Sequence, residues 1–142
     1  MKAKALQQAI YNQLNDSSLT DLLSDAYAPM VAIFSDVPQS AEGEDEDYFP
    51  FVTMGPQTIS AFDEKDNVGG NAVVQINIWD RSHSELTIKE IGDAVDARLR
   101  RNSLSISGAT HITTELESAE VSDDPDGKTK RMLMLYRILW LT

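Results

Sequence analysis

The sequence predicts an α+β fold: a single domain, residues 1–142, with two main helices packed on a largely antiparallel (mixed) four- to five-stranded sheet. Three observations favour this class. Two segments repeat apolar residues with the period of a helix, five segments have the composition of strands, and connections of hairpin length join most of those strands. A chain of 142 residues is long enough for one hydrophobic core.

The first helix is expected over residues 2–15, where apolar residues recur at every fourth position (Leu6, Ile10, Leu14) and form a narrow stripe. A short second helix is predicted over residues 19–27. It ends before Pro29, because the residue that precedes a proline is pushed out of the α region.

Strand character begins at residues 30–34 and resumes at residues 49–60, with an acidic loop over residues 35–47 between them. Pro56 lies inside the second of these strands, and proline cannot donate a hydrogen bond to a sheet. This segment is therefore predicted to be an edge strand or to contain a bulge at Gly55 and Pro56.

A polar hairpin connection, residues 62–71, leads into the clearest strand, residues 72–80. This strand alternates cleanly, which is typical of one buried and one wet face. One face carries Val74, Ile76 and Ile78, and the other carries Val73, Gln75, Asn77 and Trp79.

The second long helix is expected to begin at Ser82, because residues 82–85 fit a capping box in which serine and glutamate bond to each other's amides. Its apolar face is formed by Ile88, Ile91, Val95 and Leu99. Asp93 and Asp96 fall on the face expected to meet solvent. A strand over residues 110–121 follows, with a buried face formed by Ile112, Thr114 and Leu116.

The last strand, residues 131–141, is apolar on both faces, so both faces must be covered. Two helices cover only one face of such a sheet; if both lie there, a partner must cover the other. We predict that one face of this strand is a subunit interface, with core packing under a helix as the alternative. The predicted interface residues are Met132, Met134, Tyr136, Ile138 and Trp140, together with Trp79; the other face carries Leu133, Leu135, Leu139 and Leu141, interrupted by Arg137.

The formal net charge is −11, and residues 1–80 contribute 13 acidic residues against three lysines. This balance argues against nucleic acid as a bound ligand, because phosphate binding requires clustered Lys and Arg. The simplest reading of the acidic segments is solvated loops; the functional alternative is a lumen lining or docking loops. The residues concerned are Glu42, Glu44, Asp45, Glu46, Asp47, Asp63, Glu64 and Asp66.

Nothing in the sequence specifies an enzyme, and we predict no catalytic, cofactor-binding or metal site and no cofactor. There is no cysteine, and the two histidines, His83 and His111, have no partner at metal-ligand spacing. No nucleophile elbow or phosphate-binding loop is present. The N-terminal segment lacks the apolar run of a signal peptide, so we expect an intracellular soluble protein.

Four features occur in an order that carries a family resemblance: the first helix, an acidic loop leading into residues 49–55 (Phe-Pro-Phe-Val-Thr-Met-Gly), the strand over residues 73–79 with its following helix, and the final strand, which begins Arg-Met-Leu-Met-Leu-Tyr-Arg-Ile. This order resembles the phage tail completion, or tail terminator, proteins of long-tailed bacteriophages and their prophages. The resemblance covers nearly the whole chain, although its individual motifs are short.

The resemblance implies a non-enzymatic virion assembly protein. Such a protein is expected to be a homo-oligomer, typically a hexameric ring, that caps the tail tube and joins tail to head. Its implied partners are the tail tube protein and head-completion or connector proteins, with DNA passing through without specific binding and no membrane involved. It would reside in the host cytoplasm and then in the virion tail. The alternative is a small acidic binding module or inhibitor that mimics nucleic acid.

Overall fold

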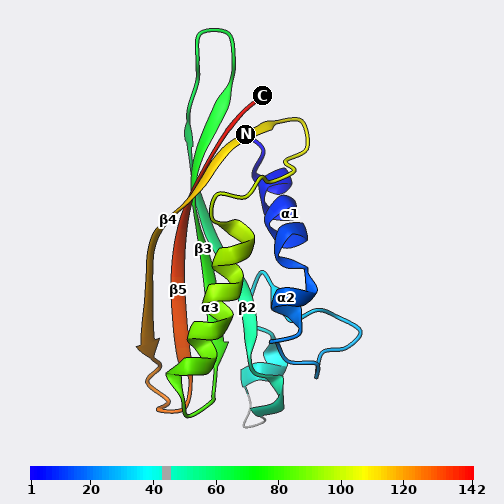
Figure 1. Ribbon diagram of the computed structural model, residues 1–142, viewed down its shortest axis with the longest axis vertical. Coiled ribbons are helices and arrows are strands. Elements are labelled where there is room, and N and C mark those ends of the chain that lie inside the picture. The colour runs from blue at the N-terminus through cyan, green and yellow to red at the C-terminus, as the bar shows by residue number, and fades with distance from the viewer. Residues whose placement is uncertain (43–45) are drawn as a thin grey trace.

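The computed structural model describes residues 1–42 and 46–142 and confirms the α+β class. Five strands form one mixed sheet in the order β1-β2-β3-β5-β4, and the helices pack on one of its faces (Figure 1). The elements are α1 (Ala3–Leu14), α2 (Ser17–Thr20), β1 (Ile33–Phe34), the 3-10 helices η1 (Gln39–Glu42) and η2 (Glu46–Tyr48), β2 (Phe51–Ala61), β3 (Gly69–Asp80), α3 (Glu85–Leu99), β4 (Thr110–Asp123) and β5 (Lys130–Leu141).

All neighbouring strands are antiparallel except β1, which runs parallel to β2 and pairs only with Val52 and Thr53. The register of β2 shifts between Met54 and Gln57, which confirms the predicted bulge. Two register shifts interrupt β4. The first turns Ile112 outward, where it is 46% exposed, so the predicted burial of this residue is wrong.

The two main helices bury the stripes predicted for them. Side chains from α1 (Leu6, Ile10, Leu14) and α3 (Ile88, Ile91, Val95, Leu99) lie in one core with the inner face of the sheet. The start of α3 differs from the prediction, because Ser84 and not Ser82 is the N-cap and accepts a hydrogen bond from the Leu86 amide at 3.1 Å. Ser82 instead donates to an Asp80 carboxylate oxygen at 2.5 Å.

The region between the first helix and the sheet contains less regular structure than the sequence predicts. The second helix ends at Thr20, and the chain then makes turns in which the amides of Ala28 and Met30 donate to the carbonyls of Asp25 and Tyr27. The first strand is correspondingly short, because only Ile33 and Phe34 reach β2.

Candidate assembly surfaces

The face of β5 predicted as a subunit interface is buried by the chain's own helices. Its five residues are at most 8% exposed, and they belong to the core formed with α1 and α3 (Met132, Met134, Tyr136, Ile138, Trp140). The structure therefore corrects that prediction: this face is packed under helices, which was the alternative reading. The reason is that both main helices lie on the same side of the sheet (Figure 1).

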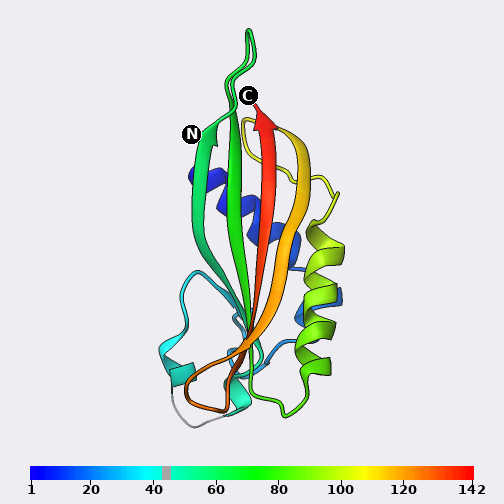
Figure 2. The same ribbon diagram turned by 90° about the vertical axis from the view of Figure 1, so that its left-hand side faces the viewer.

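The opposite face of the sheet has no helix over it, as Figure 2 shows for the described part of the chain. The residues of β5 on this face include the four leucines that we call the leucine stripe (Leu133, Leu135, Leu139, Leu141). Each is half-buried by its neighbours in the sheet, and polar side chains of β3 and β4 flank the stripe. An apolar stripe with a polar rim is typical of a surface that becomes buried on assembly.

Arg137 interrupts the leucine stripe, but its charge is compensated within the same face. Its guanidinium donates to the Asn71 side-chain oxygen at 2.9 Å and forms a short ion pair with Glu117. The stripe can therefore be covered without leaving an unpaired arginine, which would be costly to bury.

Trp79, the remaining predicted interface residue, also lies on the open side of the sheet. Its indole donates to the Thr53 hydroxyl at 3.0 Å and stacks on Phe51 with ring centroids 6.2 Å apart. The Arg131 guanidinium lies 5.5 Å from its ring centroid. Trp79 is part of an aromatic cluster that connects the segments before β2 to the edge of the sheet (Tyr27, Phe34, Tyr48, Phe49, Phe51, Trp79).

The two acidic segments lie at opposite ends of the molecule. The connection between β2 and β3 projects beyond one end of the sheet, and η2 lies at the other (Figure 1). Asp63, Glu64 and Asp66 are exposed in the first segment, as are Glu46 and Asp47 in the second. Of the other predicted acidic residues, Glu42 ends η1, and Glu44 and Asp45 lie outside the described residues.

The projecting connection has a fixed base. The Gly69 amide donates to the Asp63 carboxylate at 3.1 Å, and the Thr142 amide donates to the Val68 carbonyl at 2.7 Å. A Cβ at Gly70 would lie 2.1 Å from the Trp140 ring, so this close approach requires glycine. The acidic tip therefore extends from a base held by both the core and the end of β5.

A polar network between α3 and β5 was missed by the sequence analysis. The Tyr136 hydroxyl donates to Asp96 at 2.8 Å, and Arg100 pairs with the same carboxylate at 2.6 Å. Burial, with the hydrogen bond to Asp96, raises the pKa of Tyr136 far above its usual range. The prediction that Asp96 is an ordinary solvated residue is therefore wrong, because its hydrogen bond to Tyr136 fixes α3 on the sheet.

The turn between β4 and β5 is closed by Asp126. Its carboxylate accepts hydrogen bonds from the Thr129 hydroxyl at 2.7 Å and from the amides of Thr129 and Lys128. These bonds hold the pKa of Asp126 at about 2. Arg81 donates to the same Thr129 hydroxyl at 3.1 Å, which links this turn to the connection between β3 and α3.

His111 gives the fold a predicted sensitivity to mild acid. Its Nε2 lies 2.7 Å from the hydroxyl of the fully buried Thr114, and partial burial lowers the pKa of His111 below its usual value. Because the unfolded chain binds the proton more readily, the free energy of unfolding should fall as the pH drops below about 6.5. Chemical denaturation of His111→Gln between about pH 5 and 7.5 should show a weaker pH dependence than wild type. His83→Gln is the control; an equal loss of pH dependence there would contradict the assignment.

Within residues 1–42 and 46–142 no group of three His, Asp or Glu side chains is placed to hold a metal ion. None of the described helices is long and apolar enough to cross a membrane. A sheet that is covered by helices on one face and carries an apolar stripe on the other is typical of proteins that assemble with further copies or partners.

Comparison with known proteins identifies the family. The family model for Tail completion protein gp17 matches residues 8–140, and the chain belongs to this family. It is 26% identical over 137 residues to Tail completion protein gp17 of Bacillus phage SPP1, covering 96% of this chain and 92% of that protein. The matched family and this relative are both phage tail completion proteins, so the predicted resemblance is confirmed.

Solved structures share the fold. A chain from the virion of a native gene transfer agent (GTA) particle matches with a TM-score of 0.81 at 21% identity, covering 99% of this chain and 97% of that chain. A second solved structure matches with a TM-score of 0.53 at 11% identity, covering 98% and 94% of the two chains.

Proposed function

We propose that the protein forms a ring, a hexamer by family resemblance, that caps the tail tube and joins the tail to the head. Family membership supplies the tail role. The observation that carries the finer proposal is the open sheet face, where four leucines and no described covering element leave the single copy incomplete. Burying each large side chain is worth about 1.5–3 kcal/mol relative to full exposure, and the half-buried stripe retains part of that gain for assembly.

The acidic residues suit a structure through which DNA slides. A net charge of −11 repels phosphate, so DNA would pass without being held. The two acidic segments occupy opposite ends, which favours docking roles toward tail and head over a shared lining of one constriction. We assign Asp63, Glu64 and Asp66 to one docking end and Glu46 and Asp47 to the other.

Mass and shape of the purified protein test this proposal. Light scattering across a concentration and salt series should reveal a particle of several copies, and negative-stain images of the same sample should show a central hole. The same measurement is repeated with purified phage tails added, because some rings close only on their target. A single copy under every condition, with no binding to tails, would contradict the ring and favour the acidic binding module.

A further inference from the structure

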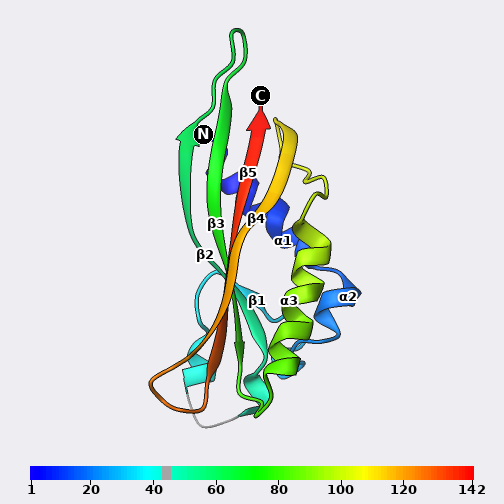
Figure 3. The ribbon, with the colours of Figure 1, turned by 60° about the vertical axis from the view of Figure 1, so that its left-hand side comes forward.

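We propose that neighbouring copies join edge to edge. The free edge of β2 near its connection to β3 (the upper half in Figure 3) in one copy pairs antiparallel with the free edge of β4 near its turn to β5 (the lower half) in the next copy. One sheet would then continue from copy to copy around the ring. This inference rests on the proposed ring and names the surfaces that close it. The two strands lie at opposite edges of the sheet, as Figure 3 shows.

The upper half of β2 has unpaired backbone groups. The Phe62 amide donates to the Gly69 carbonyl, and this pairing fixes which residues of β2 bond to β3. By the alternation of antiparallel strands, the amides and carbonyls of Gln57, Ile59 and Ala61 point away from β3. No described residue bonds to them, because β1 covers only the lower part of β2.

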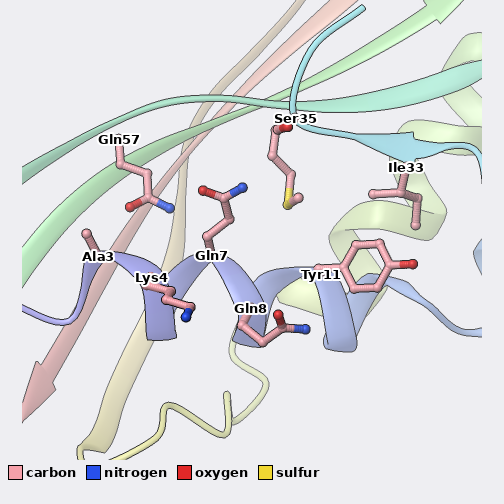
Figure 4. Close-up of a pocket in the computed structure, with 9 residues that line it drawn as sticks. Ala3, Lys4, Gln7, Gln8, Tyr11, Ile33, Ser35 and Gln57 are labelled. Atoms are coloured by element: carbon pink, nitrogen blue, oxygen red, sulfur yellow. The ribbon is translucent and has the colours of Figure 1, made fainter. Parts of the chain in front are cut away.

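Two hollows border this edge. A hollow of about 540 Å³ lies between α1 and β2, with Gln7 and Gln57 extending into it from the two walls (Figure 4). A second hollow of about 280 Å³ continues along Ile59 and Ala61. The edge itself carries no charge, bulge or proline above Pro56, and such features are what normally prevent pairing with another chain.

The lower half of β4 offers the matching edge. The Asp124 amide donates to the Thr129 carbonyl, which by the same alternation turns the backbone groups of Ala119, Val121 and Asp123 outward. The upper half is not free, because the Arg101 amide donates to the Thr114 carbonyl at 2.9 Å. A regular stretch, residues 118–123, therefore remains below the second bulge.

The two edges have the same number of outward backbone groups, and the side chains of those residues lie on the same side of the sheet. Each offers three residues with outward backbone groups, and in both sets the side chains of those residues lie on the helix side of the sheet. Pairing them keeps the helices of both copies on one side. β2 and β4 also run in opposite directions, so two copies that point the same way meet antiparallel.

The heights of the two edges are compatible with the same pairing. Ile59 is level with Thr114 across the sheet, so the free part of β4 lies lower and paired copies are staggered. A closed barrel requires such a stagger, and contact between two different edges is the kind that closes a ring.

Disulfide trapping tests the pairing directly, because the chain has no cysteine of its own. In the register that pairs Ile59 with Val121, Thr58 lies opposite Ser122, and both residues are exposed. Their Cα atoms would be roughly 4.5 Å apart, within disulfide range. Thr58→Cys combined with Ser122→Cys should give a ladder of linked copies on oxidation; Ser60→Cys with Ser122→Cys tests the neighbouring register. The control combines Thr58→Cys with Thr110→Cys at the other end of β4.

A backbone variant provides a second readout. Ala61→Pro removes one outward amide without touching the bonds to β3, whereas Ala61→Val keeps that amide. Ala61→Pro should weaken each contact between copies roughly fivefold to tenfold, measured by light scattering, with Ala61→Val close to wild type. A particle with a central hole but no specific cross-link would overturn edge pairing and leave the ring intact. Cross-linked ladders without a closed particle would support edge pairing and contradict the ring.

Discussion

Trp140→Ala is expected to lower the free energy of unfolding by roughly 3–5 kcal/mol, as large-to-small core substitutions do. Trp140 is 2% exposed and its ring packs directly against Gly70, so the truncation leaves a cavity that the backbone of β3 cannot fill. The measurement is urea denaturation at a protein concentration low enough to keep the copies separate.

The matched control for this experiment is Leu139→Ala, which lies on the same strand but on the open face. Its side chain is half-buried in the single copy, so its cost to folding should be clearly smaller than that of Trp140→Ala. Equal, small effects for both variants would mean that the face carrying Trp140 is not part of the core, and would support a subunit interface on that face.

The double variant Leu135→Lys and Leu139→Lys should reduce incorporation into phage tails by at least roughly tenfold, because two charges would enter a surface buried on assembly. Both side chains point away from the core and are only half-buried, so the single copy should lose much less stability than Trp140→Ala does. Incorporation is measured as the amount of protein that sediments with tails assembled in its presence.

Thr113→Lys is the control for the leucine stripe. This residue lies on the same open face, on the flanking strand β4 opposite Leu139, and outside the apolar stripe. It should leave incorporation close to wild type. If the leucine variant sedimented with tails as well as the threonine variant did, the stripe would not be a buried surface of the completed tail.

The element order could be predicted from the sequence because periodicity is local. Leu6, Ile10 and Leu14 define α1, and the alternation around Ile76 defines β3, without reference to the rest of the chain. The same local pattern also predicted that β5 must be covered twice. The pattern did not predict which face of β5 the helices cover, because a strand that is apolar on both faces can be buried equally well on either one.

Two further features that the sequence did not indicate depend on contacts between distant parts of the chain. Asp96 has the spacing of a solvated residue on α3, and only the position of Tyr136 forty residues later gives it a buried partner. The aromatic cluster around Phe51 brings together rings from segments between residues 27 and 79, which no short motif signals. The N-cap error is local instead: Asp80 accepts a hydrogen bond from Ser82, and Ser84 caps the helix.

The placement of acidic residues at both ends of the long axis has a consequence for growth of the tail. Two copies stacked end to end would bring Glu46 and Asp47 of one toward Asp63, Glu64 and Asp66 of the other. Like charges among these carboxylates oppose that contact, within the roughly 8 Å over which salt leaves them unscreened, while Lys65 and Lys128 beside them offset part of the repulsion. In the proposed ring, the net repulsion between these ends would disfavour a second layer of the same protein.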